Sequence, residues 1–552
     1  MRRPAATLCL SLAALLAAAG SLAAGAMPAL AGGTTTTLYV ATAGSDSNNN
    51  CQVQASPCQT IGHAVAQAET DHGAVAIQIG SGTYPEQVTI APPSTSPMTS
   101  LILQGPTSGE PAVVRPTSLG DNVTELSTGH FFDNNSGSSP FAVGAIIGVQ
   151  TGSKDEAAGG TTTGNNATIT ISGLTVSGAG ATSLPPSGQL MGIAFVDTSG
   201  SITGNTVESI EQKSTIGQAD VEGIQVKATA VAASVTVSGN TVRSDGGHVY
   251  VDLMAGASGS LTATVSGNIL TGDPTTAMTP VAQFGVTAGG LTSLSVWGNL
   301  ITNFQSPWSV GAVWLDSQAP GAACSVTSND LVGNDNGVDL HGATGCSISY
   351  NAISAGATGV EIGPGYSSWL PSVSNTVSGN WISGTTTVST TLSGDYATSP
   401  FSTMPSVAGA PVDGVLVWDG TGNAIAHNVI SAFVTDAYVG EDPVYLNNTA
   451  AWSSGIPSWA ASLVIANTTV HYNDLGALAT PAAGSGVSGY GAACLNSTGQ
   501  CTNTALDATS NWWGSPQGPT TSTGHGHTGV PVSAHVDYVP WCRNATCAVL
   551  EG

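Results

Sequence analysis

Ile202-Thr-Gly-Asn205-Thr-Val207 and Val237-Ser-Gly-Asn240-Thr-Val242 are two copies of one short pattern. In each copy a β-rich residue, two small or polar residues and an asparagine precede a second β-rich segment. Further copies centre on Asn268, Asn299, Asn329, Asn351, Asn380, Asn428 and Asn473. Successive copies follow one another at intervals of 22 to 48 residues. An internal repeat of this length is typical of a solenoid, in which each repeat forms one coil and stacks on its neighbours.

Short strands flank the repeated asparagine, as in Gly223-Ile-Gln-Val-Lys227 and Gly337-Val-Asp-Leu-His341. Their period-2 alternation predicts that Ile, Val and Leu point inward and the intervening residues outward. Asparagine tolerates left-handed backbone geometry and bonds its own turn, so stacked copies can form an amide ladder. The pattern predicts an all-β fold, a right-handed parallel β-helix. A leucine-rich repeat and a propeller are disfavoured, since the L-x-x-L-x-L signature is missing and each unit is too short for four strands.

The N-terminal residues have the layout of a secretory signal peptide. Arg2 and Arg3 precede an uncharged apolar run from Leu8 to Met27, and Ala29-Leu-Ala31 offers small residues for cleavage. We therefore expect a signal peptide over residues 1–31 and a secreted, extracellular protein with no membrane segment in its mature form. The apolar run borders on transmembrane length, so an uncleaved anchor is the alternative.

The ends of a solenoid expose strand edges and need caps. We expect an N-terminal cap with the first coils over residues 32–100, including a short helix at Thr60–Glu69. Coils with loop insertions would follow over residues 101–480, and a disulfide-bearing C-terminal cap over residues 481–552.

Eight cysteines outside the signal peptide fall into close pairs, which predict four disulfides: Cys51–Cys58, Cys324–Cys346, Cys494–Cys501 and Cys542–Cys547. Disulfides belong to an oxidising compartment and agree with export. Cys324 and Cys346 each lie five residues before a repeated asparagine, so they occupy the same slot in consecutive coils. Stacked strands lie about 4.8 Å apart, within the Cα separation that a disulfide accepts.

Charge narrows the choice of partner. Without Arg2 and Arg3 the chain has six basic residues against 33 acidic ones, a difference of −27. Such a chain repels nucleic acid and anionic lipid. It also repels acidic polymers unless a divalent cation bridges the charges. We expect no nucleic-acid partner, a monomer, and an extracellular polysaccharide that is either neutral or bridged by calcium.

At this point the chain resembles a known superfamily. Three N-terminal stretches are similar to the opening segment of the pectin-lyase-like β-helix superfamily: Tyr39-Val-Ala-Thr-Ala-Gly-Ser-Asp46, Pro57-Cys-Gln-Thr-Ile61 and Gly82-Thr-Tyr-Pro-Glu86. Asn511-Trp-Trp-Gly-Ser-Pro-Gln-Gly-Pro519 resembles its closing segment. The resemblance implies the β-helix over nearly the whole mature chain. It implies no single activity, because the superfamily includes polysaccharide lyases, glycoside hydrolases, uronate epimerases and non-catalytic surface proteins.

Outward side chains at equivalent strand positions should form a stripe along the solenoid. The candidates mix carboxylates, aromatics and other polar residues: Gln225, Lys227, Tyr250, Asp252, Trp314, Asp316, Asp339, His341, Glu361, Trp418 and Asp419. We expect Tyr250, Trp314 and Trp418 to stack on sugar rings and the carboxylates to bond hydroxyl groups or calcium. The alternative is that all of these are ordinary solvated positions.

Asp339 and Glu361 are the sharpest pair, with Asp316 and His341 as further catalytic candidates. Gly337-Val-Asp-Leu and Gly359-Val-Glu-Ile align 22 residues apart, which predicts neighbouring carboxylates on adjacent coils. Retaining glycosidases place two carboxyl groups about 5–5.5 Å apart, and such closeness raises one pKa, as a general acid needs. With Asp335, the same pair is also a candidate calcium site.

The segment Asp335-Asn-Gly-Val-Asp339 resembles the calcium loop of β-helical pectate lyases, Asp-Asp-Gly-x-Asp, with Asn336 replacing the second aspartate. The resemblance also implies a lysine base in a later strand, where this chain has Glu361. Within the repeats the basic residues are Lys213, Lys227 and Arg243. This departure argues against lyase chemistry.

A second charged zone lies between Glu208 and Asp252. Lys227, Arg243 and Asp252, with His248 and Tyr250, could form a site for proton abstraction, and the alternative is a salt-bridged patch.

Two functional hypotheses follow. The protein binds, and in the stronger version cleaves as a hydrolase or lyase, a polysaccharide along the stripe. Alternatively it is a non-catalytic surface or matrix protein whose β-helix serves as a rigid rod.

Overall fold

The computed structural model describes most of the chain in separate stretches. These are residues 35–125, 141–151, 165–183, 185–210, 221–243, 249–256, 258–272, 283–304, 311–319, 321–365, 370–385, 413–433, 435–439, 465–478, 490–494, 505–521 and 527–551. The predicted signal peptide lies outside them. No helix within these stretches has the length and apolar character to cross a membrane.

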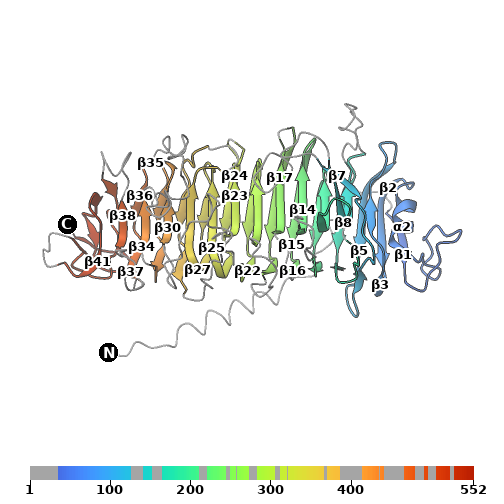
Figure 1. The fold of residues 1–552 in the computed structure, drawn as a ribbon, viewed down its shortest axis with the longest axis horizontal. Coiled ribbons are helices and arrows are strands. Elements are labelled where there is room, and N and C mark those ends of the chain that lie inside the picture. The colour runs from blue at the N-terminus through green and yellow to red at the C-terminus, as the bar shows by residue number, and fades with distance from the viewer. Residues whose placement is uncertain are drawn as a thin grey trace.

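The described strands stack into an elongated right-handed parallel β-helix (Figure 1), so the predicted fold is confirmed. Each coil contributes strands to three parallel rows. The first row is a 15-stranded sheet, here called sheet A. Its strands are β1 (Thr36–Val40), β2 (Gly73–Ile79), β5 (Met98–Gln104), β9 (Thr168–Ser172), β12 (Gly200–Thr203), β15 (Ala232–Ser238), β18 (Ser260–Ser266), β21 (Ser293–Trp297), β24 (Ala323–Thr327), β26 (Ser347–Ser349), β28 (Thr376–Ser378), β32 (Ala424–Ala426), β36 (Thr469–His471), β39 (Leu506–Asp507) and β42 (Val536–Asp537).

The other two rows form one 23-stranded sheet, because β25 (Asp330–His341) and β27 (Ala352–Gly363) run through both. The short-strand row follows the asparagine turns. Besides the first halves of β25 and β27, it contains β3 (Gly82–Tyr84), β6 (Ala112–Val114), β10 (Leu174–Ser177), β13 (Thr206–Glu208), β16 (Thr241–Arg243), β19 (Ile269–Thr271), β22 (Leu300–Thr302), β29 (Trp381–Gly384), β33 (Val429–Ser431) and β37 (Asp474–Ala477).

The long-strand row completes the coil. It contains the second halves of β25 and β27 together with β4 (Val88–Ile90), β8 (Phe141–Gln150), β11 (Leu190–Val196), β14 (Val221–Ala228), β17 (Val249–Ala255), β20 (Phe284–Gly289), β23 (Gly311–Asp316), β30 (Asp413–Val417), β34 (Thr435–Val439) and β38 (Tyr490–Cys494). The strand β7 (Val123–Glu125) pairs with β8 in antiparallel fashion. Three short pairs remain: β31 (Gly420–Thr421) with β35 (Ile465–Ala466), β40 (Pro519–Thr520) with β41 (Gly529–Pro531), and β43 (Trp541–Cys542) with β44 (Leu550–Glu551).

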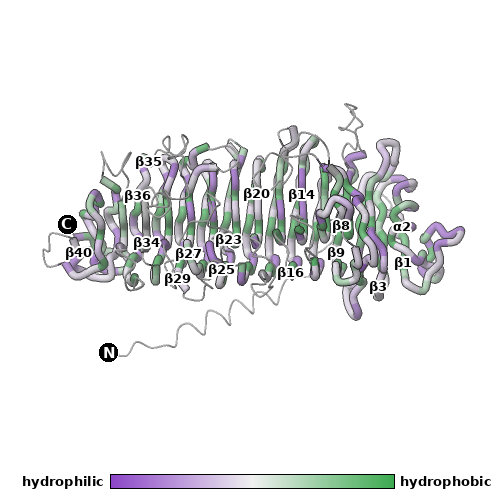
Figure 2. Tube along the Cα trace, in the orientation of Figure 1, coloured by the Kyte–Doolittle hydropathy of each residue, from purple (hydrophilic) through white to green (hydrophobic). Residues whose placement is uncertain are grey.

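One continuous apolar core fills the interior. In sheet A the predicted alternation holds, as in β15, where buried and exposed residues alternate. Apolar residues recur in the strands along the whole length of the molecule (Figure 2). Burial of apolar surface stabilises the fold by about 25 cal/mol for each Å². Repeated in every coil, this burial is the main stabilisation available to a chain with so few charges.

The repeated asparagines form a buried ladder from Asn205 to Asn511. The Nδ2 group of each asparagine donates to Oδ1 of the asparagine on the next coil at 2.9–3.1 Å. The same Oδ1 atom accepts the backbone N–H of the previous asparagine at 2.8–3.0 Å. Nδ2 also donates to a strand carbonyl, as from Asn299 to Val265 at 3.0 Å. Each buried amide is therefore fully used, as burial requires.

Both ends carry caps. The helix α2 (Ile61–Ala68) begins at Thr60, whose side chain accepts the N–H of His63, and it buries its apolar face against the first coil. At the other end Trp513 is fully buried beneath the last short strands.

Three predicted disulfides are present, Cys51–Cys58, Cys324–Cys346 and Cys542–Cys547. Cys494 is disulfide-bonded too, but its expected partner Cys501 lies outside the described residues.

Candidate functional site

The outward side chains of the long-strand row are buried, unlike those of sheet A. Every residue of β14, β17, β20 and β23 is buried on both faces of the sheet. The alternative interpretation, that these outward residues are ordinary solvated positions, is therefore wrong for this row. What the structure contains instead is a buried line of polar side chains on the outside of a β-helix, where each polar atom needs a partner.

Register places the predicted residues in two adjacent lines. The central line joins Gln225, Asp252, Thr287, Trp314, Asp339 and Glu361, one residue from each successive coil. The flanking line, two residues further along each strand, joins Lys227, Met254, Gly289, Asp316 and His341. Asp339 and Glu361 are direct partners on β25 and β27, as the 22-residue offset predicts.

Glu361 is held by an aromatic residue from the next coil. The indole Nε1 of Trp418 donates to Oε1 of Glu361 at 2.8 Å. The indole lies over Gly363, where a Cβ would come within 2.4 Å of Nε1, so a larger residue would displace the ring. A hydrogen bond from a neutral donor stabilises the charged form of a carboxylate.

Asp339 sits in a different environment. Its Oδ1 accepts a hydrogen bond from Asn336 Nδ2 at 3.0 Å, and the backbone N–H of Gly311 also faces the carboxyl group. Burial, and then the negative charge of Glu361, raise the pKa of Asp339 well above its usual value. The two carboxyl groups therefore have different surroundings, the condition under which one acts as an acid and the other as a base or nucleophile.

His341 and two tryptophans surround the pair. The ring of His341 lies 4.5 Å from that of Trp314, at an interplanar angle of 33°, and its Nε2 is 4.0 Å from Oε1 of Glu361. Burial lowers the pKa of His341 to about 3, partly opposed by a hydrogen bond to the backbone of Pro364. The imidazole is thus neutral near pH 7. Asp316, opposite His341 in register, accepts a hydrogen bond from Ser317 Oγ at 2.9 Å.

The predicted calcium ligands are not gathered. Asp335, Asp339 and Glu361 do not form a set whose oxygen atoms all lie within 4.8 Å of one another. Among the described residues that spacing occurs only for Cys51, Cys58 and His63, where the two cysteines share a disulfide.

The second charged zone is split by the fold, and its prediction as one site is wrong. Lys227 Nζ forms a fully buried ion pair with Glu125 Oε2 at 2.8 Å. Arg243 lies on the short-strand row and pairs at the surface with Glu208. Asp252 accepts a hydrogen bond from Thr287 Oγ1. His248 lies outside the described residues.

Tyr250 is not an outward residue. It belongs to the apolar core, with its ring 4.6 Å from Phe304 in an edge-on arrangement. Its position in β17 corresponds to Gly223 in β14 and Gly285 in β20, where the register skips a residue. The strict period-2 rule fails at this irregularity, which explains the wrong prediction for Tyr250.

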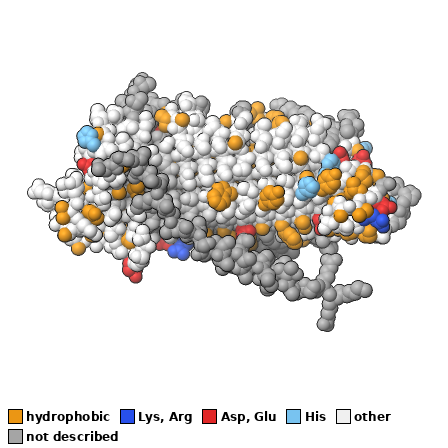
Figure 3. Space-filling model, turned by 180° about the vertical axis from the view of Figure 1, so that it is seen from behind, with side chains coloured by type: hydrophobic (Ala, Val, Ile, Leu, Met, Phe, Trp, Pro, Cys, Tyr) orange, Lys and Arg blue, Asp and Glu red, His pale blue; other side chains and the backbone are white. Residues whose placement is uncertain are grey.

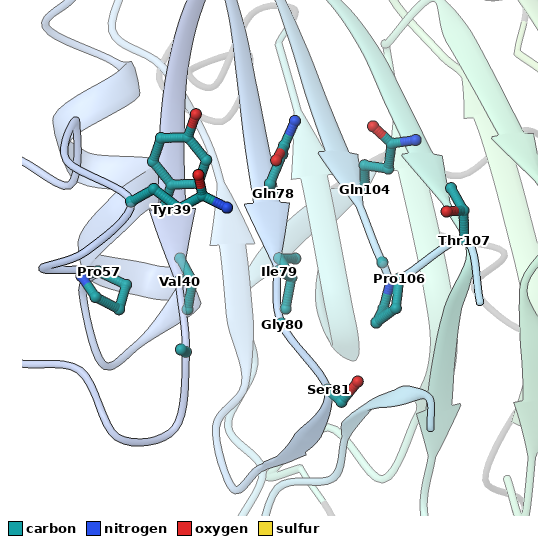
Figure 4. A pocket seen from close by; sticks show the side chains of 13 residues that line it. Tyr39, Val40, Pro57, Gln78, Ile79, Gly80, Ser81, Gln104, Pro106 and Thr107 are labelled. Carbon is teal, nitrogen blue, oxygen red and sulfur yellow. The ribbon is translucent and has the colours of Figure 1, made fainter. Parts of the chain in front are cut away.

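A groove that the sequence did not indicate lies at the N-terminal end. It has a volume of about 520 Å³ and crosses β1, β2 and β5. Tyr39, Gln78 and Gln104 occupy the same register position on these strands and line one side (Figure 4), with Pro57 and Thr107 nearby. An aromatic ring beside two amides is suited to a hydroxyl-rich ligand. The only sequence signal was their period-2 spacing in strands.

No family model matches the chain, and no curated protein matches it. Solved structures that resemble it share little sequence. A structure of XylC with xylose has a TM-score of 0.39 at 11% identity, covering 79% of this chain and 83% of XylC. The GH136 lacto-N-biosidase from Eubacterium ramulus has a TM-score of 0.36 at 9% identity, covering 80% and 63%. The periplasmic alginate epimerase AlgG has a TM-score of 0.32 at 11% identity, covering 65% and 75%. The strand pairing of this chain itself establishes that it is a right-handed parallel β-helix.

Proposed function

We propose that this protein acts on an extracellular polysaccharide and hydrolyses it at Asp339 and Glu361. The proposal depends on one observation: Asp339 and Glu361 are neighbouring carboxyl groups with different surroundings. Two carboxyl groups are direct register partners on adjacent coils, about 4.8 Å apart as strands. One has a raised pKa, and the other accepts a hydrogen bond from Trp418.

The chemistry that suits this spacing is retaining glycoside hydrolysis. Asp339, protonated, would donate its proton to the glycosidic oxygen as the bond to the anomeric carbon breaks. The Glu361 carboxylate would attack that carbon and form a glycosyl ester. Asp339, now a carboxylate, would take a proton from water as the water displaces Glu361 from the sugar. Atoms and protons balance without a metal, and both residues return to their starting forms.

The surrounding residues fit these roles. Neutral His341 places no positive charge beside Glu361, so the carboxylate keeps its nucleophilic character. Trp314, next to Asp339 in register, and Trp418 offer aromatic faces of the kind that stack on sugar rings. A neutral glycan is favoured over an acidic one because the chain is strongly acidic. The disulfides are compatible with secretion of the protein.

Burial favours a second candidate, a non-catalytic rod. Trp314 is the most exposed of the four residues Trp314, Asp339, Glu361 and Trp418, at only 5%. A saccharide can reach the pair only if this face opens. If it never opens, the polar line serves only to fix the register of the coils.

The experiment compares the wild-type protein with Asp339→Asn and Glu361→Gln on a panel of neutral and acidic polysaccharides, with and without a chelator. We expect release of reducing ends by the wild type, a loss of at least about a thousandfold in either variant, and no effect of the chelator. Asp197→Asn is the control, because Asp197 is a buried carboxylate at a turn on another coil, bonded by Thr229.

A wild-type protein that leaves the whole panel intact would reject hydrolysis in favour of the rod. Full activity in both variants would reject the assignment of the pair. Asp197→Asn should lose stability but keep its turnover.

A further inference from the structure

Exposed aromatic residues gather along the asparagine turns, on the side of the β-helix away from the long-strand row. Tyr350, His427 and Tyr472 each directly precede a ladder asparagine. Trp297 ends β21, and Trp381 begins β29 just after its own turn. The exposed fractions are 73% for Tyr350, 57% for Trp381 and 48% for Trp297. We refer to these five residues as the aromatic turn surface.

Three of these residues, Tyr350, His427 and Tyr472, have a costly backbone conformation. At the same turn position five other coils have glycine, with φ between 61° and 66°: Gly204, Gly239, Gly267, Gly298 and Gly379. Tyr350, His427 and Tyr472 adopt φ of 57° to 59° there. A residue with a Cβ is disfavoured in this region, and a bulky one most of all. Since Tyr350 and Tyr472 are exposed, burial of their rings does not compensate, and strain of this kind points to function.

The rings are ordered relative to one another. His427 and Tyr472 stack with centroids 5.2 Å apart and planes inclined by only 6°. Tyr350 leans over Gly379 on the next coil, where a Cβ would come within 2.8 Å of its ring. Glycine at this coil thus leaves room for Tyr350, and the rings form a line that follows the helix axis at multiples of the coil spacing of about 4.8 Å.

The neighbouring surface is uncharged and rich in hydroxyl groups. The outward residues of sheet A beside the rings are mainly serine and threonine: Ser325, Thr327, Ser347, Ser349, Thr376 and Ser378. Among the outward side chains of the sheet A strands β21, β24, β26, β28, β32 and β36, His471 is the one titratable residue, and it pairs with Asp507 at 2.8 Å. Seen from behind, the molecule has a broad face with few charged side chains and separate apolar ones along its length (Figure 3).

From these observations we infer a second glycan site: the aromatic turn surface binds one chain of an uncharged polysaccharide, laid along the helix axis. Exposed aromatic rings contact the apolar parts of sugar rings, and the serine and threonine hydroxyls can bond sugar hydroxyls. The lack of charge gives no attraction for nucleic acid or an anionic lipid surface. This site is independent of Asp339 and Glu361 and would hold a long substrate or anchor the protein.

The test uses the double variant Tyr350→Gly/Tyr472→Gly in native affinity electrophoresis with xyloglucan, glucomannan, mixed-linkage β-glucan and dextran. Glycine suits the φ of both turns, so the melting temperature should stay the same or rise. Retardation by at least one of these polymers should weaken about tenfold or more. Ser328→Gly is the matched control, because Ser328 has φ of 56° at the same turn position and no ring. It should bind like the wild type.

Three results would overturn the inference. The first is a wild type that none of the four polymers retards, and the second is a double variant that binds as well as the wild type. The third is a wild-type dimer, detected by sedimentation, that the double variant cannot form, which would assign the surface to a second copy of the chain. Tyr350→Phe keeps the ring and should retain binding, and Asp339→Asn/Glu361→Gln should also bind, which separates this site from the proposed catalytic one.

Discussion

Cys324 and Cys346 are joined across two consecutive coils, with their Cα atoms 4.5 Å apart. Their neighbours Ser325 and Ser347 are register partners in β24 and β26, so the disulfide closes one complete 22-residue coil. That coil also contains Asp339, and the following coil contains Glu361. The bond therefore fixes the register of the two coils that form the candidate site.

Removing this disulfide should destabilise the rod without changing its fold. For a closed loop of 22 residues, the loss in Cys324→Ser/Cys346→Ser should be about 3 kcal/mol of unfolding free energy. Chemical denaturation measures this loss. Peptide mapping of the unreduced wild type should recover the two cysteines in one linked fragment; an alkylated Cys324 would show that the register is different.

The asparagine ladder should be sensitive to a change of one atom. In Asn299→Asp the new carboxylate cannot donate to Asn329 Oδ1 or to the carbonyl of Val265, as the Nδ2 group does. We expect a loss of at least about 3 kcal/mol at pH 7, because a buried charge lacks compensation. The loss should shrink as the pH falls and the new side chain is protonated. Thermal unfolding at pH 4 and pH 7 tests this, and equal losses at both would contradict it.

The ion pair of Lys227 with Glu125 should behave as a buried pair. Its side chains are 3% and 0% exposed, so Lys227→Met removes a buried cation from beside the Glu125 carboxylate, at a cost of about 3–5 kcal/mol. Lys227→Met/Glu125→Gln should recover much of that loss. The surface pair of Arg243 and Glu208 is the control, and Arg243→Met should cost no more than about 1 kcal/mol. Urea unfolding of the variants measures these differences, and similar losses for Lys227→Met and Arg243→Met would contradict the expectation.

His341 should make folding more favourable as the pH rises. Its pKa is about 3 in the folded protein against 6.5 as the ordinary value, so between these limits the unfolded chain binds more protons. Stability linked to His341 therefore increases from pH 3 to 6.5 and is lost as the pH falls. In His341→Gln this contribution disappears. The stability difference between wild type and variant should grow across that window and level off above it; a difference independent of pH would show that the imidazole is not buried neutral.

Asp339 should act in the opposite direction. Its pKa in the folded state lies well above 3.8, so above pH 3.8 the folded protein retains a proton that the unfolded chain releases. Stability linked to Asp339 falls as the pH rises from 3.8 to the folded pKa. Asp339→Asn removes this decline, so the unfolding free energy of the variant should rise relative to that of the wild type as the pH increases. If the wild type gains instead, the folded Asp339 is ionised.

Much of this architecture could be predicted from the sequence because it depends on local periodicity. The asparagine spacing predicts the coils and the disulfide between Cys324 and Cys346, and it predicts the register that joins Asp339 to Glu361. The alternation of apolar residues along a strand shows which side chains point inward. It does not show whether the outer face of the strand is buried. Lys227 has its partner Glu125 on a strand 102 residues earlier in the chain, and neither this pairing nor the burial of the long-strand row is visible in the alternation of the strands.

One wrong prediction, for Tyr250, and one missed feature, the aromatic turn surface, have local causes. Tyr250 points inward because the strand is irregular at its position, and a period-2 pattern does not show this. The aromatic turn surface had a visible signal, a bulky residue at a position where five of the ten ladder coils have glycine, but its meaning depends on the left-handed φ that only the structure provides.

The asparagine ladder runs in one direction, since each asparagine from Asn205 to Asn473 donates one Nδ2 hydrogen to the asparagine of the following coil. The first asparagine presents its acceptor to the backbone N–H of Leu174, and the last turns its amide back to the carbonyls of Val470 and Ala508. Every interior coil thus presents the same polarity above and below. Duplication or deletion of one such coil would leave the hydrogen bonds at the first and last asparagines unchanged. The length of the β-helix can therefore evolve separately from its ends.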